Sequence, residues 1–118
     1  MLPPPIQRPR IPIWTAGYWP ATAPFRRAAR WDGVAPLRSG HLFRGLSPDE
    51  LANCVAYIRS VRTSDRRFDV VSFQTEPNQD ELVPEYGRAG ATWWLESANP
   101  VSESLAEFRA RVLRGPPK

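Results

Sequence analysis

The sequence is poor in several residue types on which common functions depend. Its 118 residues include one cysteine, one histidine and one methionine, and Lys118 is the only lysine. A single thiol, Cys54, excludes an internal disulfide, and no second thiol or histidine cluster stands near it to hold a metal. We therefore expect no metal site and interpret Cys54 as a small buried hydrophobe.

Long apolar runs are also missing. No stretch approaches the roughly 20 residues needed to span a bilayer, and the amino-terminal MLPPPIQRPR has neither the apolar h-region nor the cleavage site of a signal peptide. We expect a cytoplasmic protein with no membrane partner. The net charge of +4 comes almost entirely from arginine and permits an anionic ligand. Nucleic acid is not expected, because Arg26, Arg27 and Arg30 fit a solvated helix face.

The apolar content is nevertheless sufficient for a core. With 42% hydrophobic and 11% aromatic residues, the sequence predicts a single domain over residues 1–118, with a Pro-rich lead-in at 1–10 and a loose tail at 115–118. The fourteen prolines fall mainly in the head, in the tail and at the boundaries of expected elements. We therefore expect them to mark the ends of helices and strands and not to prevent folding.

Between the prolines, strand and helix patterns alternate. Strands are expected at 11–16, 34–37, 68–73 and 91–96, and helices at 21–31, 48–62, 79–89 and from 99, 100 or 102 onwards. The clearest helix is the second, because Ser47 and Glu50 have capping-box spacing and Pro48 occupies the first helical position. Gly17 is expected to end the first strand in a tight turn. Gly90 is suited to be the left-handed stop of the third helix.

This alternation predicts an α/β fold with a parallel sheet and right-handed crossovers. Two architectures share the pattern: a small doubly wound sheet, and part of a (βα)8 barrel, for which the usual chain has about 250 residues. The four βα units correspond to half of such a barrel.

Several segments carry a resemblance to a known family. In order they are PPPIQRPRIPIWTAGYWP, FRRAARWDGV, SPDELANCVAYIRSVR, FDVVSFQTE and EYGRAGATWWLE. Together they resemble the C-terminal half of the luciferase-like monooxygenase family, which includes flavin-dependent monooxygenases and deazaflavin-dependent oxidoreductases. The resemblance covers nearly the whole chain, beginning at residue 1.

The resemblance implies a fold, a cofactor and partners. The fold would be four βα units forming the C-terminal half of a (βα)8 (TIM-type) barrel. The cofactor would be FMN or a deazaflavin coenzyme, which would act on a small organic substrate in an oxidoreductase reaction of the monooxygenase type. Because the family's first four strands carry much of the pocket, the resemblance also implies self-association or a separate N-terminal half.

A candidate cofactor site follows the first strand. Thr15, Ala16 and Gly17 are small residues before an expected helix, where backbone N–H groups and the helix dipole favour an anion. The resemblance makes that anion the phosphate end of the flavin-type cofactor. Tyr18 and Trp19 beside it either stack on the ring or fill core beneath the loop. The alternative is an ordinary turn that needs glycine for its geometry.

A candidate substrate pocket combines Trp14, Trp94 and Glu96. Glu96 lies at the carboxyl end of the last expected strand, the edge where (βα)8 enzymes place their chemistry. Alternation puts Glu96 on the face of Thr92 and Trp94, with Trp93 on the opposite face. Facing inward, Glu96 would orient a flavin hydroxyl or a substrate; facing outward, it would pair with an arginine of a neighbouring helix.

No catalytic residue is assigned from the sequence. The pKa of a histidine such as His41 is suited to catalysis, but no partner carboxylate or nucleophile can be assigned to it, which favours an incidental loop residue. Two alternatives to the oxidoreductase therefore stay open. One is a non-catalytic half-barrel that acts only as an assembly partner, and the other is a small α/β domain that binds a phosphate-bearing ligand.

Overall fold

The computed structural model describes residues 3, 6, 8–40, 44–74, 79–97 and 103–116. Its elements are, in chain order, β1 (Trp14–Trp19), α1 (Ala23–Ala28), β2 (Gly33–Arg38), α2 (Pro48–Val61), β3 (Asp69–Gln74), the 3-10 helix η1 (Gln79–Leu82), α3 (Val83–Ala89), β4 (Trp93–Glu96) and α4 (Leu105–Arg114). The strands form one sheet in the order β1-β2-β3-β4, and all three pairings are parallel. The predicted α/β class with a four-stranded parallel sheet is therefore confirmed.

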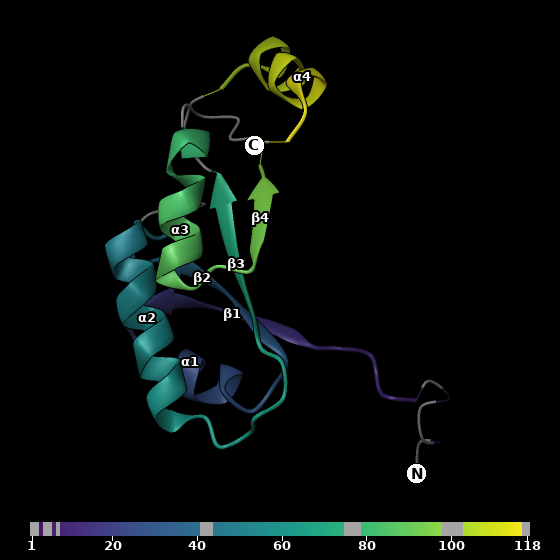
Figure 1. The fold of residues 1–118 in the computed structure, drawn as a ribbon, viewed down its shortest axis with the longest axis vertical. Helices are drawn as coiled ribbons and strands as arrows, with labels where there is room; N and C mark the ends of the chain where they lie inside the picture. The colour runs from purple at the N-terminus through teal and green to yellow at the C-terminus, as the bar shows by residue number, and fades with distance from the viewer. Residues whose placement is uncertain are drawn as a thin grey trace.

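The helices α1, α2 and α3 all lie on one face of this sheet (Figure 1). The strand order explains this arrangement, because right-handed crossovers that always step in the same direction leave their helices on the same side. A doubly wound sheet reverses direction and carries helices on both faces. Neither feature occurs among the described elements, and the arrangement is compatible with half a (βα)8 barrel.

Local capping signals place two helix ends where the sequence predicts them. The Ser47 hydroxyl accepts a hydrogen bond from the Glu50 amide, and the Glu50 carboxylate accepts one from the Ser47 amide, both at 3.2 Å. This capping box starts α2 at Pro48. At the other end of the domain, α3 stops at Gly90, whose φ of +118° is in the left-handed region. A Cβ at Gly90 would also come within 3.1 Å of Val55.

The prediction of a tight turn at Gly17 is wrong. The strand β1 continues to Trp19, so Gly17 lies inside the strand. A Cβ at Gly17 would come within 2.5 Å of the Cβ of Pro24, which means that glycine is needed for the close approach of α1 to β1. A tertiary contact, and not a turn, accounts for this residue.

The last helix begins later than expected. α4 starts at Leu105 after a capping box between Ser104 and Glu107, a signal of the same kind as that of α2. The expected starting points at residues 99, 100 and 102 lie outside the described residues, and so does His41.

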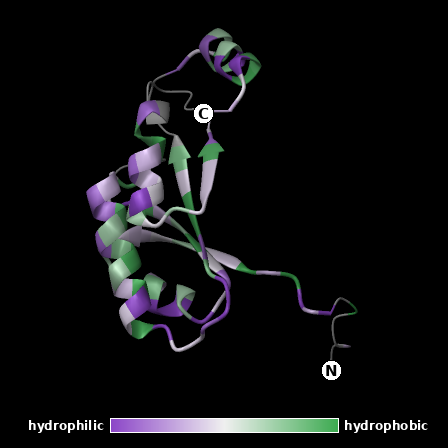
Figure 2. Ribbon diagram, in the orientation of Figure 1, coloured by the Kyte–Doolittle hydropathy of each residue, from purple (hydrophilic) through white to green (hydrophobic). Residues whose placement is uncertain are grey.

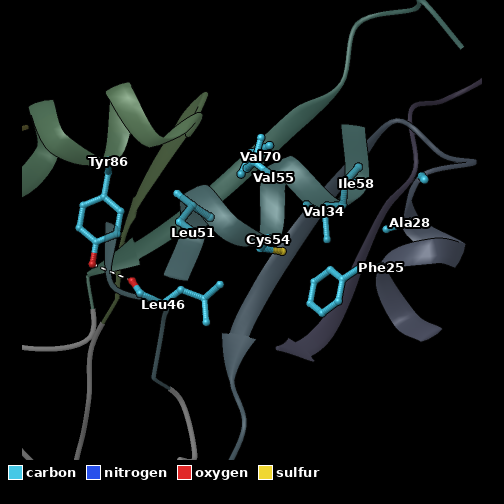
Figure 3. Close-up of a cluster of buried hydrophobic side chains, with 11 residues drawn as sticks. Phe25, Ala28, Val34, Leu46, Leu51, Cys54, Val55, Ile58, Val70 and Tyr86 are labelled. Atoms are coloured by element: carbon cyan, nitrogen blue, oxygen red, sulfur yellow. Dashed lines mark hydrogen bonds between the residues drawn. The ribbon is translucent and has the colours of Figure 1, made fainter. Parts of the chain in front are cut away.

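The core lies between the three helices and the sheet (Figure 3). Its buried side chains are Phe25, Ala28, Ala29, Val34, Leu46, Leu51, Cys54, Val55, Ile58, Val70 and Tyr86. Burial raises the pKa of the Cys54 thiol to about 12, so this residue packs as a hydrophobe, as predicted. The Tyr86 hydroxyl donates a hydrogen bond of 2.8 Å to the Leu46 carbonyl and thereby links α3 to the segment before α2.

Side-chain hydrogen bonds attach the lead-in to the sheet. Arg10 pairs with the Asp32 carboxylate at 2.5 Å, and the Ile13 amide donates to the same carboxylate at 2.8 Å. The Ile13 amide foremost, and then Arg10, hold the pKa of Asp32 below its ordinary value. These contacts fix the direction in which the chain enters β1.

Along α1, the arginines and the apolar residues separate as predicted: Arg26, Arg27 and Arg30 are exposed, whereas Phe25 is fully buried. None of the helices in the described part of the chain is long and apolar enough to cross a membrane.

Candidate functional site on the uncovered face of the sheet

The two faces of the sheet differ in what covers them. Exposure alternates along β1, with Thr15, Gly17 and Trp19 turned toward α1 and the residues between them turned the other way. Register partners in neighbouring parallel strands share a face, so the pairing extends this second set across the sheet. We call it the open face; it comprises Trp14, Ala16, Tyr18, Gly33, Ala35, Leu37, Asp69, Val71, Phe73, Trp93 and Leu95.

The open face is apolar except for Asp69, which starts β3. Near their carboxyl ends, β3 and β4 carry the open-face residues Phe73 and Leu95, in a part of the sheet that Figure 2 colours largely as hydrophobic. Tyr18 and Trp93 are both 46% exposed although they are large and aromatic. An exposed apolar surface of this kind marks a binding or assembly site.

Two tryptophans close the amino-terminal end of the open face. The rings of Trp14 and Trp93 lie 5.6 Å apart, although they belong to the two edge strands β1 and β4. Three strand spacings separate these edges, about 14 Å in a flat sheet, so the indoles reach toward each other over the middle strands. Beneath them, a Cβ at Gly33 would come within 2.6 Å of the Trp14 ring. Val71, in the middle of the open face, is 1% exposed, whereas Tyr18 and Leu95 nearer the carboxyl ends are 46% and 39% exposed.

The sheet is interrupted at the carboxyl ends of β2 and β3. Their pairing covers only two residues of each strand and stops at Val34. Two residues later comes Pro36, which has no N–H to donate to a ladder. Leu37 instead forms an isolated antiparallel bridge with Gly45. Gly45 also lies close to β3, because a Cβ on this glycine would come within 3.3 Å of the Phe73 carbonyl oxygen. The segment around Gly45 thus separates the two strands at the edge where barrel enzymes build their sites.

Trp94 and Glu96 lie on the helix side of the sheet and not on the open face. The Trp94 ring packs 5.1 Å from that of Tyr86, and its Nε1 donates a hydrogen bond of 3.0 Å to Glu96. Glu96 forms an ion pair with Arg111 of α4, which corresponds to the outward-facing one of the two roles that the sequence left open. The structure therefore brings Trp14 near Trp93 and separates it from Trp94 and Glu96.

Arg111 is held by three groups at the carboxyl end of β4. It binds Glu103 at 2.6 Å, the Glu96 carboxylate, and the Ser97 carbonyl at 2.9 Å. The hydrogen bonds that Arg111 donates to Glu103 foremost, opposed by burial and reinforced by its hydrogen bond to Glu96, raise the pKa of Arg111. This network holds α4 beyond the end of the sheet, where Leu105 and Leu113 remain exposed (Figure 1).

Of the predicted cofactor residues, Ala16 and Tyr18 lie on the open face, whereas Thr15, Gly17 and Trp19 face α1. Trp93 and Leu95 are open-face residues that the predicted pocket left out. The sequence signal for them is the alternation of side chains in β4. Trp93 and Leu95 make one face of the strand wholly apolar, whereas the other face ends in the carboxylate of Glu96.

One guanidinium lies at the carboxyl end of β2. Arg38 is the register partner of Trp19 and donates to the Glu50 carboxylate at 2.5 Å. Burial raises the pKa of Glu50, but hydrogen bonds from Arg38 and from Ser47 outweigh it and leave the pKa below its ordinary value. The Nε of Arg38 is buried and has no hydrogen-bond partner in the part of the chain that the structure describes. Its hydrogen-bonding capacity is thus unused among the described residues, on the helix side of this edge.

A cavity of about 290 Å³ lies on the helix side, between α2 and the amino-terminal ends of β3 and β4. Its lining residues are Val55, Ile58, Arg59, Arg62, Ser64, Phe68, Val70, Gly90 and Thr92. The Arg62 guanidinium is already bound to the carbonyls of Ala29, Trp31 and Arg66. The Nη groups of Arg62 are thus engaged with the backbone around the cavity.

The fold and the site define an α/β protein with a one-sided, four-stranded parallel sheet and an aromatic open face. No family model matches this chain, and neither a curated protein nor a solved structure matches it. Its function is therefore inferred from the residues of the open face and of the neighbouring strand ends.

Proposed function

We propose that this chain is one half of a (βα)8-barrel oxidoreductase of the luciferase-like type, which uses a flavin or deazaflavin coenzyme. The observation that carries the proposal is the apolar, aromatic open face of a parallel sheet whose helices α1, α2 and α3 lie on the other side. In a (βα)8 barrel the face without helices is the interior, and the carboxyl ends of its strands carry the active site.

The open face suits the planar ring of such a coenzyme. Tyr18 and Leu95 are partly exposed near the carboxyl ends of the two edge strands, and Ala16 and Ala35 beside them leave space for a flat ligand. Aromatic side chains favour stacked or edge-on contacts with a ring. When bound, the coenzyme supplies the redox chemistry, either hydride exchange or reaction with oxygen. The side chains of the open face would bind the ring, orient it and exclude water.

The anionic end of the coenzyme would lie at the carboxyl edge of β1 and β2. Arg38 supports this placement by its positive charge at this edge, where its Nη2 is bound to the Glu50 carboxylate. Thr15, Gly17 and Trp19 would act from the helix side, by positioning the strand that carries Tyr18. Ring contacts would come from Ala16 and Tyr18.

The same geometry favours a second candidate, a non-catalytic half-barrel that acts as an assembly partner. The charged groups at the carboxyl end of β4, Glu96 and Arg111, are engaged with each other and with Glu103. These ion pairs hold α4 in place, so in this second candidate the two groups serve structure and do not bind a coenzyme. Assembly without coenzyme binding would identify this second candidate.

Titration of the purified chain with FMN and with a deazaflavin coenzyme tests the first candidate, with coenzyme fluorescence as the readout. Tyr18→Ala is expected to weaken binding about two- to tenfold, because an aromatic contact contributes about 0.5–1.5 kcal/mol. Ile11→Ala is the matched control, since it removes an exposed apolar side chain from the lead-in before β1. If neither coenzyme binds, or if Tyr18→Ala and Ile11→Ala behave alike, the proposal is wrong.

A further inference from the structure

The two edge strands of the sheet, one at each side, could pair with each other in an assembly of two copies. β1 and β4 are the outermost strands of the order β1-β2-β3-β4, and each pairs on one side only among the described residues. An unpaired edge presents a row of backbone N–H and C=O groups that can receive another strand. Because both strands run in the same direction, β4 of one sheet can extend another sheet at β1 by a parallel pairing.

We propose that two copies of this chain associate about a twofold axis, with β4 of each copy pairing in parallel with β1 of the other. The result is a closed barrel that encloses both open faces. This inference rests on the barrel geometry of the proposed function and does not depend on its coenzyme.

Strand number and symmetry both favour a second copy. Four strands from each of two copies make the eight of a closed (βα)8 barrel. A twofold axis along the barrel keeps all strands parallel, and the two β4–β1 junctions are then identical, as in an isologous dimer. Closure also removes both unpaired edges at once.

The exposed apolar area is of the size that a dimer needs. Trp14, Tyr18, Trp93 and Leu95 are 39–46% exposed, which for side chains of this size corresponds to on the order of 400 Å². A stable interface buries about 800 Å² on each partner. The backbone of two strand edges and the exposed side of α4 supply the remainder.

Residue sizes are complementary across the proposed junction. β4 carries the bulky Trp93 and Leu95 on the open face, whereas β1 carries Ala16 between its two aromatic residues. Pairing β4 with β1 of the second copy places large side chains beside a small one, as close packing of a barrel interior requires.

The exposed side chains of α4 have a place in the same assembly. Leu105, Val112 and Leu113 are 55–81% exposed, and none of the residues of α4, all of which the structure describes, is buried. In a (βα)8 barrel, the helix after a strand packs against the outside of that strand and its next neighbour. The strand next to β4 is β1 of the second copy, and α4, which Arg111 holds beyond the carboxyl end of β4, would lie at the carboxyl end of this junction with its exposed apolar side chains toward the second copy.

Sedimentation velocity between about 1 and 100 μM protein tests the proposal, because mass action makes a dimer depend on concentration. The wild-type chain is expected to sediment as two copies at the upper end. Leu95→Lys on β4 and Tyr18→Lys on β1 are expected to raise the dissociation constant at least about tenfold each, since each buries a charge in the barrel interior. Ala52→Lys is the matched control, because it adds the same charge to the exposed surface of α2.

Circular dichroism of every variant confirms that the helices remain folded. A folded monomer, an assembly of any other size, or a dimer that Ala52→Lys weakens as much as Leu95→Lys would overturn the proposal. The coenzyme titration is independent of this result. A dimer that binds neither coenzyme supports the twofold barrel and rejects the oxidoreductase, whereas a monomer that binds one does the reverse.

Discussion

The two faces of this sheet are both apolar but are covered differently. On the helix side, Phe25 and Val34 are almost completely buried, whereas on the open face Tyr18 and Trp93 keep nearly half of their surface exposed. Parallel sheets in known folds are covered on both faces, and their strands are apolar throughout. The sheet therefore has the strands of a fully covered one, whereas the described part of the chain supplies helices for one of its sides.

This difference separates stability from function within the same strands. The helix side contributes most of the free energy of folding of the single chain, because burial of apolar surface is the dominant favourable contribution. The open face remains available for a ligand or for a second copy. Substitutions on the two faces should consequently have different effects.

The largest contrast is expected between Phe25→Ala and Tyr18→Ala. Phe25 is fully buried between α1 and the sheet, so its truncation should lower the free energy of unfolding by about 3–5 kcal/mol. Tyr18→Ala removes a ring that is 46% exposed and should cost less than about 1.5 kcal/mol. Urea unfolding followed by circular dichroism measures both values.

The measurement belongs at the lowest practical protein concentration, where self-association contributes little to the apparent stability. Equal losses from the two substitutions would show that the open face is as important to the single chain as its core. The distinction between the faces would then be wrong.

A smaller contrast is expected between two tyrosines on the helix side. The Tyr86 hydroxyl is bonded to the Leu46 carbonyl, so Tyr86→Phe leaves a buried acceptor without this donor and should cost about 1–2 kcal/mol. The Tyr57 hydroxyl is buried without a hydrogen-bond partner in the described ranges, so Tyr57→Phe should change stability by less than about 0.5 kcal/mol. Thermal unfolding of both variants compares them directly, and a Tyr57→Phe loss as large as that of Tyr86→Phe would contradict this assignment.

Features that depend on neighbouring residues were predictable from the sequence. The capping box of Ser47 and Glu50 and the left-handed stop at Gly90 both form as expected, because each is specified within a few residues. Gly17 was misinterpreted for the opposite reason. Its requirement comes from Pro24, which packs against it, and a short local pattern cannot distinguish that contact from a turn.

The candidate site was only partly predictable. Alternation correctly separates Trp93 from Trp94, but the pattern is symmetrical and does not say which of them faces the helices. That choice depends on Tyr86 and Arg111, which hold Trp94 and Glu96 on the helix side. Both partners lie at sequence distances that no local pattern connects to β4.

The smallest expected effect concerns the entry of the chain into β1, which positions Trp14 at the end of the open face. Asp32 receives hydrogen bonds from Ile13 and Arg10, and its pKa is lower in the folded protein than its ordinary value of 3.8. The unfolded chain therefore binds a proton more readily at this site. This contribution to stability is complete above about pH 4 and is lost as the pH falls through the lower pKa of the folded state.

Asp32→Asn should reduce the slope of stability against pH below about pH 4 and should cost about 0.5–1 kcal/mol at neutral pH. The cost is small because Arg10 is partly exposed and because the asparagine oxygen can still accept from the Ile13 amide. Unfolding curves at a series of pH values measure the slope, and Asp65→Asn, at an exposed position, is the control. If both variants keep the wild-type slope, Asp32 does not couple the lead-in to the sheet, and the position of Trp14 must depend on its ring contact with Trp93.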